Sequence, residues 1–281
     1  MDELTLQLPH LKLAALRWGE GQPNKILALH GWLDNAASFS FLGPKLATAG
    51  YEVVAVDLPG HGYSQHRPPG ASYHLLDYLH EVDQALIALG WSRPILLGHS
   101  LGAVISSLYA AAAQDRIARL ILVEALGPVA AIPDDVPINL SKALAKTRTK
   151  SCQKKVYYTI EKLVEDRRRG FGGLSAEASR ILVERNIQPV KDGWVWRTDA
   201  RLRWPSYLRF SEEQVNAYLR AILTPTLLVA GDKGFISLDS EKNTRIDALA
   251  AARKETLRGG HHLHMDGDVD GLAQIIDDFL R

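Results

Sequence analysis

Short apolar runs alternate with helix-prone segments along most of this 281-residue chain, and this alternation limits its fold more than any other feature. Runs typical of buried strands lie at residues 53–57, 95–98, 120–123 and 226–230. Right-handed crossovers between such strands build a mainly parallel sheet with helices on both faces. We therefore predict an α/β fold, with functional residues in the loops that follow the carboxyl ends of strands.

The two ends of the chain complete this sheet. Residues 4–8 and 11–18 indicate an antiparallel pair at one edge, and residues 25–29 indicate a further strand. The last part of the sequence predicts a short strand at 255–257. Helices are predicted at 38–49, 74–89, from about 100 onward, at 238–252 and at 269–280.

The regular alternation stops between residues 127 and 221, where the chain is helix-prone, charged and without a clear buried strand. We predict a core domain formed by 1–126 and 222–281, and an inserted helical cap at 127–221. The aromatic residues of the cap are more often the core of a small domain than a pocket wall. They are Trp194, Trp196, Trp204, Tyr207 and Phe210.

Charge and composition give little reason to expect a macromolecular partner. The 33 Lys and Arg residues balance 32 Asp and Glu residues, which favours neither nucleic acid nor an anionic membrane. Six basic residues and no acid lie between Lys142 and Lys155. This run is interpreted as a solvated face, with steering of an anionic substrate or contact with a membrane surface as alternatives. A small-molecule partner is expected, and a homodimer remains compatible with the composition.

Cysteine usage and hydropathy indicate a soluble chain and give no sign of an oxidising compartment. Cys152 is the single cysteine, so no internal disulfide can form. The acidic start of the sequence differs from a signal peptide, and no run of about 18 apolar residues suggests a membrane span. We expect a cytoplasmic protein.

A Gly-His-Ser-Leu-Gly segment at residues 98–102 lies between an apolar run and a helix-prone segment. A sharp strand-to-helix turn strains the serine backbone, and the flanking glycines let neighbouring backbone pass closely. The turn also directs the free N–H groups of the helix start at developing negative charge. We predict that Ser100 is a nucleophile rather than a serine at a tight helix start, and that the Leu101 N–H is an oxyanion donor.

A second oxyanion donor is predicted in His30-Gly31-Trp32, which directly follows the apolar run at 25–29. The backbone N–H of Trp32 can complete an oxyanion hole with Leu101. Taken alone, a His-Gly pair after a strand is more often only a turn. The segment 57–64 is interpreted as a structural turn beside the pocket, and His61 is assigned no chemistry.

A serine hydroxyl needs a base that takes its proton and later returns it to the leaving group. The cluster after the last predicted strand, Gly259-Gly260-His261-His262-Leu263-His264, offers three imidazoles. His261 is our choice because the paired glycines let this loop lean over the serine; His262 is the second choice. His264 is expected to pack locally. Metal binding is disfavoured because the spacing does not resemble a zinc site, and no cofactor is expected.

The third catalytic group should be a carboxylate that orients the histidine. Glu124 ends the apolar run 120–123, at a strand end that faces the same site. An acid there is costly unless it has a partner, although a surface contact or a helix cap is the alternative interpretation. Asp232, which follows the run 226–230, is the alternative acid. We favour Glu124.

The stretches at 30–36 and 98–102 and the Gly-His261 loop resemble the α/β-hydrolase superfamily, and more closely its serine hydrolase-like subfamily. The resemblance implies a mostly parallel eight-stranded sheet and a helical cap. Many members carry an aspartate where this chain has Gly234. In the subfamily that place tends to be vacated and an acid follows the earlier strand, which strengthens Glu124. Related dehalogenases and epoxide hydrolases attack with an aspartate, so the serine at position 100 disfavours their reactions.

Three functions fit this pattern. A carboxylesterase acting on acyl esters is expected first, because a nucleophile, a base and two oxyanion donors suit acyl transfer without a cofactor. A thioesterase or carbon–carbon bond hydrolase is second, since the same residues would serve. A non-catalytic ligand-binding protein is third, because Gly234 leaves the usual acid place empty.

Overall fold

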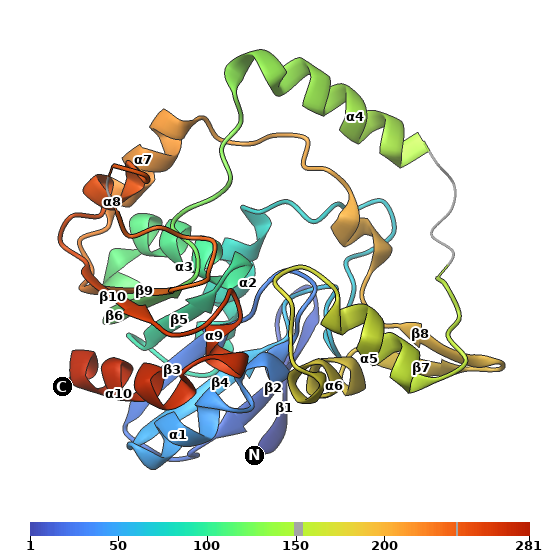
Figure 1. Cartoon of the computed structure of the whole chain (residues 1–281), viewed down its shortest axis with the longest axis horizontal. Coiled ribbons are helices and arrows are strands. Elements are labelled where there is room, and N and C mark those ends of the chain that lie inside the picture. Colours follow the sequence, from blue (N-terminus) through green and yellow to red (C-terminus); the bar gives the residue numbers. More distant parts are fainter. Residues whose placement is uncertain (149–153, 240) are drawn as a thin grey trace.

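A computed structural model describes residues 1–148, 154–239 and 241–281, and its centre is one eight-stranded sheet (Figure 1). The strand order is β1-β2-β4-β3-β5-β6-β9-β10. β1 and β2 are antiparallel at one edge, and the strands from β4 to β10 in this order run parallel. Their bounds are β1 Asp2–Gln7, β2 Lys12–Trp18, β3 Asn24–Leu29, β4 Tyr51–Val56, β5 Ile95–His99, β6 Arg119–Val123, β9 Thr226–Gly231 and β10 Arg253–Leu257. The predicted α/β fold class is confirmed.

Helices cover both faces of this sheet. α2, α3, α7 and α8 share one apolar cluster with the sheet, while α1 and α10 share the other. In β4, Val54 and Val56 belong to the first cluster, whereas Val53 and Ala55 belong to the second, as expected for a strand buried on both faces. These helices are α1 Leu42–Thr48, α2 Asp77–Ala88, α3 Leu101–Ala112, α7 Glu212–Ala221, α8 Arg245–Ala248 and α10 Val269–Leu280; the short α9 spans Leu263–Asp266.

The helix predicted at 238–252 is mostly wrong, because only the short α8 forms there in the described residues. Polar side chains instead bond to nearby backbone groups. Ser237 accepts a hydrogen bond from the Asp239 N–H at 3.2 Å, and Asp239 accepts one from the Glu241 N–H at 3.1 Å. Such local bonds stabilise turns at the expense of helix.

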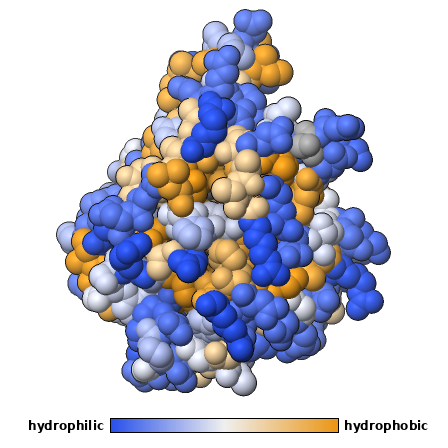
Figure 2. Space-filling view, turned by 90° about the vertical axis from the view of Figure 1, so that its left-hand side faces the viewer, coloured by the Kyte–Doolittle hydropathy of each residue, from blue (hydrophilic) through white to orange (hydrophobic). Residues whose placement is uncertain are grey.

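The segment between β6 and β9 contains helices and one small hairpin that the sequence did not indicate. α4 projects from the top of the molecule in Figure 1, and Figure 2 shows this projection above the body. The hairpin β7–β8 packs with α5 around a separate apolar cluster that includes Trp194 and Trp196, so these two aromatics join a local core as expected. The bounds are α4 Val136–Arg148, α5 Ile160–Arg168, α6 Ala176–Glu184, β7 Ile187–Val190 and β8 Gly193–Trp196.

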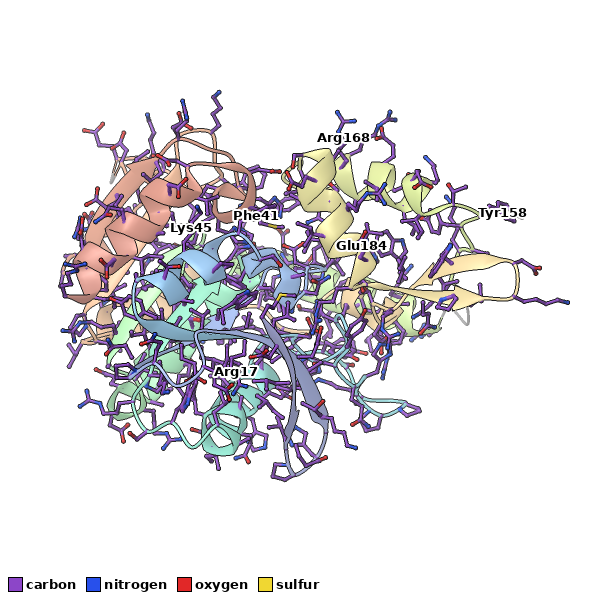
Figure 3. All side chains as sticks on the ribbon, turned by 90° about the horizontal axis from the view of Figure 1, so that it is seen from below. Arg17, Phe41, Lys45, Tyr158, Arg168 and Glu184 are labelled. Carbon is purple, nitrogen blue, oxygen red and sulfur yellow. The ribbon has the colours of Figure 1, made fainter. Side chains whose placement is uncertain are left out.

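Both α6 and α7 of the inserted segment pack against apolar residues of the rest of the chain. Figure 3 shows Phe41 beside the start of α1, on the side toward α6, whereas Arg168 and Tyr158 lie on the outer side. Phe41 packs against an apolar cluster formed by residues of α6 and the C-terminal part of the chain. α7 packs within the main core. The cap boundaries at 127 and 221 stay a prediction.

None of the helices in the described residues has the length and apolar character that a membrane span needs. Cys152 and Lys150, which belong to the predicted cysteine and basic-run interpretations, lie outside the described residues.

Candidate active site

Ser100 occupies a sharp turn between β5 and α3. Its backbone is in the left-handed region, with φ of 50° and ψ of −115°. A Cβ atom at Gly98 would lie 2.4 Å from the Ala103 nitrogen, and one at Gly102 would lie 2.0 Å from the Leu29 oxygen. Both glycines are therefore required where the turn passes neighbouring backbone, which confirms the reason for expecting small residues there.

Strained backbone gathers at three neighbouring strand ends. Besides Ser100, Leu33 after β3 and Glu124 after β6 have positive φ values, 65° and 57°. Within the described part of the chain, no other residue except glycine has this geometry. Such strain persists only where the surroundings enforce it, and it is concentrated at functional sites. The site is therefore built at the carboxyl ends of β3, β5 and β6.

Glu124 and His261 form a buried pair at this end of the sheet. His261 Nδ1 donates to Glu124 Oε2 at 3.0 Å, and the two residues are 4% and 2% exposed. The backbone N–H groups of Gly231 and Phe235 each donate to the same carboxylate at 2.8 Å. Three donors thus hold the carboxylate in place, which offsets the cost of burying its charge.

Gly234 lies directly against this carboxylate. A Cβ atom at Gly234 would be 2.0 Å from Glu124 Oε1, so the Glu124 side chain fills the space that a side chain at position 234 would need. Asp232, the alternative acid, is exposed and accepts a hydrogen bond from the Gly259 N–H at 2.8 Å. The structure therefore brings Glu124 to His261 and directs Asp232 to the loop backbone.

The histidines near His261, which are His99 at the end of β5 and His262 and His264 in the loop, have different partners. His99 Nε2 donates to the His261 carbonyl oxygen at 2.8 Å and so fixes the loop above β5. His262 Nε2 lies 3.4 Å from Asp34 Oδ2. His264 packs on His99 with ring centroids 4.0 Å apart, and burial together with His262 lowers the pKa of His264 to about 3. The local packing expected of His264 is confirmed.

Asp34 and Arg167 are site residues that the sequence reasoning did not single out. Arg167, from α5, pairs with the buried Asp34 in the loop after β3. Burial alone would raise the pKa of the Asp34 carboxyl, but Arg167 and a hydrogen bond with His262 hold this pKa well below its ordinary value. This ion pair ties the inserted segment to the loops of the candidate oxyanion donor and base. In the sequence, the only indication of this role was that Asp34 lies two residues after Trp32, in the loop of the candidate oxyanion donor.

The two predicted oxyanion donors lie at the starts of the segments that follow β3 and β5. Leu101 is the first residue of α3, where N–H groups have no acceptor within the helix. Trp32 directly precedes the strained Leu33, and its indole Nε1 donates to the Leu202 carbonyl at 3.0 Å. Their role in binding an oxyanion stays a prediction.

His61 belongs to a buried structural turn. Its ring packs on His30 with centroids 4.9 Å apart, and its Nδ1 bonds the Pro59 carbonyl at 3.1 Å. Burial lowers the pKa of His61 to about 3. Among the residues that the structure describes, no group of three or more His, Cys, Asp or Glu side chains is arranged to hold a metal ion.

Two cavities, of about 360 Å³ and 910 Å³, meet at the serine. Both are lined by Trp32, Ser100, Phe171 and His261. Of the aromatics in the inserted segment, Trp196 also lines the smaller cavity, and Tyr207 and Phe210 line the larger one. These three residues therefore contribute to cavity walls. From the sequence, a local core was the preferred interpretation for most of these aromatics, and a pocket wall was the alternative.

Known proteins identify this architecture. A sequence model of the alpha/beta hydrolase fold matches residues 24–149. Serine hydrolase-like protein 2 of Homo sapiens is 30% identical over 302 residues, covering 100% of this chain and 94% of that protein. The probable serine hydrolase of Drosophila melanogaster is 30% identical over 278 residues, covering 94% and 83%. The fold and these matches are those of α/β hydrolases. Within that superfamily, the chain belongs to the serine hydrolase-like family.

Solved structures agree with this assignment. A hypothetical protein from Pseudomonas aeruginosa PAO1 is 41% identical, with a TM-score of 0.94 and coverage of 100% of this chain and 99% of that chain. The thioesterase domain from the curacin biosynthetic pathway is 29% identical, with a TM-score of 0.87 and coverage of 98% and 99%. The resemblance predicted from the glycine-flanked serine and the histidine loop is confirmed.

Proposed function

We propose that this hydrolase cleaves carboxylic esters through an acyl-enzyme intermediate on Ser100. The observation that carries the proposal is the buried 3.0 Å contact between His261 and Glu124, beside a strained serine that shares both cavities with His261. A histidine held by a buried carboxylate is the arrangement that activates a serine hydroxyl.

In the first half of the reaction, Ser100 Oγ attacks the ester carbonyl carbon while His261 Nε2 accepts the hydroxyl proton. The carbonyl oxygen becomes an oxyanion, which receives hydrogen bonds from the backbone N–H groups of Trp32 and Leu101. Collapse of this intermediate breaks the bond to the alcohol oxygen, and His261 returns the proton to that oxygen. In the second half, water attacks the acyl-serine by the same proton route and releases the carboxylic acid.

Glu124 orients the base in this scheme. Its hydrogen bond to Nδ1 leaves Nε2 of the neutral imidazole free to accept the serine proton, and the carboxylate stabilises the imidazolium that follows. Gly231 and Phe235 keep the carboxylate aimed at His261 through their N–H groups. The segment 127–221 is proposed to act as the cap over the serine, because residues of α5 and of the 154–158 stretch line the smaller cavity.

Thioesters are a second candidate substrate class. A thioesterase domain is among the most similar solved structures, and Lys154, Lys155 and Arg203 line the smaller cavity. The same serine, base and oxyanion donors would serve, with a thiolate as the leaving group.

The test is covalent labelling with a fluorophosphonate probe, combined with hydrolysis of nitrophenyl esters and the matching thioesters. We expect labelling and turnover in the native protein, and loss of both in Ser100→Ala and His261→Ala. Ser92→Ala, a change at an exposed serine that lines neither cavity, is the matched control and should keep both. A folded native protein that neither labels nor turns over any ester or thioester would instead be a ligand-binding protein on this fold.

A further inference from the structure

The two cavities that meet at Ser100 differ in the charged side chains that line them, which are more numerous in the smaller cavity. They share only four lining residues, Trp32, Ser100, Phe171 and His261, among those that the structure describes. Of these four, Ser100 is the candidate nucleophile, His261 is the candidate base and Trp32 carries a candidate oxyanion donor. A bound acyl compound that reaches the serine therefore extends in two directions, into surroundings of different polarity.

The wall of the larger cavity is mostly apolar, although Asp77, Arg209 and Arg245 also line it. At about 910 Å³ it is at the upper end of the volumes typical of small-molecule sites. Figure 2 shows apolar residues interrupting the hydrophilic surface on the face below the projecting top of the molecule. The hydrophobic wall of this cavity includes Leu101, Val104, Leu126, Val129, Phe210 and Ile236. A hydrocarbon chain gains about 0.8 kcal/mol for each CH₂ group buried in such surroundings.

The smaller cavity is charged, and each of its acids already has a cation. Asp34 pairs with Arg167, Asp166 with Lys162 at 2.9 Å, and Asp199 with Arg201 at 2.6 Å. These pairs leave the carboxylates of this cavity with little capacity to neutralise further positive charge.

Three cations of the smaller cavity have no carboxylate partner within 4.0 Å in the described part of the chain. Lys154 Nζ donates to the Arg197 carbonyl at 2.9 Å, Lys155 lies over the Tyr157 ring at 4.6 Å, and Arg203 lies over the Trp32 ring at 5.8 Å. Contacts with rings and carbonyl oxygens orient a cation but do not neutralise it. The smaller cavity therefore carries an excess of positive charge directed at whatever occupies it.

We infer that the substrate is an amphipathic acyl compound, with a hydrocarbon acyl chain in the larger cavity and an anionic leaving group in the smaller one. This inference rests on the proposed function of Ser100. The anionic group is a carboxylate or phosphate carried by the alcohol or thiol that leaves. Arg203 and Lys155 act as specificity residues for this anion.

The order of the two half-reactions explains why the hydrocarbon part is the acyl group. The acyl chain must stay bound to Ser100 after the leaving group departs, and the apolar cavity retains it. Departure of a charged leaving group then empties the polar cavity, where the water needed for deacylation can collect beside His261. If the acyl group instead occupied the smaller cavity and the hydrocarbon part were the leaving group, the water for deacylation would have to enter the apolar cavity.

Octanoyl esters of glycolate and of glycolamide test this inference, because the two leaving groups have nearly the same shape and differ in charge. We expect kcat/KM to be at least tenfold higher for the glycolate ester, with a preference that weakens as salt is added. In the double variant Lys155→Gln/Arg203→Gln, the ratio of kcat/KM for the glycolate ester to that for the glycolamide ester should approach one. Lys191→Gln removes one positive charge at an exposed site that lines neither cavity, and it should keep the native preference.

The acyl side is tested with acetyl and octanoyl glycolate. Val104→Phe narrows the larger cavity and should lower the octanoyl-to-acetyl ratio of kcat/KM at least tenfold. Equal rates for glycolate and glycolamide esters, or an unchanged preference in the double variant, would overturn the inference. Failure of the proposed function is distinguished from this, because the native protein would then neither label with fluorophosphonate nor hydrolyse the neutral glycolamide ester.

Discussion

The ends of two adjacent strands, β6 and β9, offer the base a carboxylate in very different ways. After β6, Glu124 is 2% exposed and receives hydrogen bonds from His261 and from two backbone N–H groups. After β9, Asp232 is exposed and bonds the Gly259 backbone, while Gly234 has no side chain. The two ends are complementary, because the Glu124 carboxylate fills the space that Gly234 leaves open.

The geometry around the histidine, and not the identity of the strand, therefore decides where an acid can act. A carboxylate reaches His261 from β6 by a longer side chain and a strained backbone, with φ of 57° at Glu124. The β9 loop contributes N–H donors in place of an acid. One strand end thus supplies the charge and the other supplies the groups that hold it.

The largest expected effect is that of Glu124→Gln. The amide keeps the size of the side chain but cannot accept from three donors at once, so His261 loses its orientation and the imidazolium loses its counter-charge. We expect kcat to fall by about 10³- to 10⁴-fold. Steady-state ester hydrolysis measures this, with Asp232→Asn as the matched control that should stay within about threefold of the native rate. If Asp232→Asn abolished ester hydrolysis while Glu124→Gln stayed active, Asp232 and not Glu124 would be the catalytic acid.

Gly234→Ala tests the complementarity of the two ends. The added Cβ atom would lie 2.0 Å from Glu124 Oε1, which forces the carboxylate away from His261. We expect a loss of about 100-fold in kcat, as for removal of one directed catalytic hydrogen bond. Gly260→Ala, in the neighbouring loop after β10, is the control, because the nearest described atom to its added Cβ atom would be 3.9 Å away. Equal losses in both variants would indicate a general effect on the loop.

His264 provides a contrast because it is a buried imidazole that makes no ion pair with a carboxylate among the described residues. Burial lowers its pKa in the folded protein to about 3, against about 6.5 in an unfolded chain. Its contribution to stability is therefore complete above pH 6.5 and is lost as the pH falls toward 3. His264→Phe should remove about 1.4 kcal/mol of the stability that the native protein loses between pH 7.5 and 5.5.

Urea unfolding at the two pH values measures this term. The control is His80→Phe, at an exposed histidine, which should lose as much stability on acidification as the native protein. An unchanged pH dependence in His264→Phe would contradict the role of burial.

The smallest effect is expected from Asp232 as a structural residue. Asp232→Ala removes an exposed hydrogen bond to the Gly259 N–H, which should lower the free energy of unfolding by about 0.5–1 kcal/mol. Thermal and urea unfolding detect a change of this size. A decrease in the free energy of unfolding above about 2 kcal/mol would show that this hydrogen bond at the end of β9 stabilises the fold more than expected for an exposed contact.

Local patterns in the sequence predicted the parts of this molecule that depend on local geometry. The turn at Ser100 needs small residues at fixed offsets, so Gly98 and Gly102 indicated it. The period of apolar residues predicted the final helix at 269–280, in which Leu272 and Ile276 are buried. The acid at the end of an apolar strand indicated Glu124, because an unpaired charge there would be costly.

Contacts between distant segments were not predictable in this way. Arg185 pairs with Asp57 across 128 residues, and Arg167 pairs with Asp34 across 133 residues. Nothing in the local pattern of either partner identifies the other. The same holds for the hairpin β7–β8, whose four-residue strands are too short to show a clear period.

The most direct test of the central claim is a crystal structure of the protein after reaction with a fluorophosphonate. We expect a phosphonyl group bonded to Ser100 Oγ, with its oxygen within hydrogen-bond distance of the Trp32 and Leu101 backbone nitrogens, and with His261 Nδ1 still bonded to Glu124. An adduct on another residue, or His261 turned toward Asp232, would contradict the central claim.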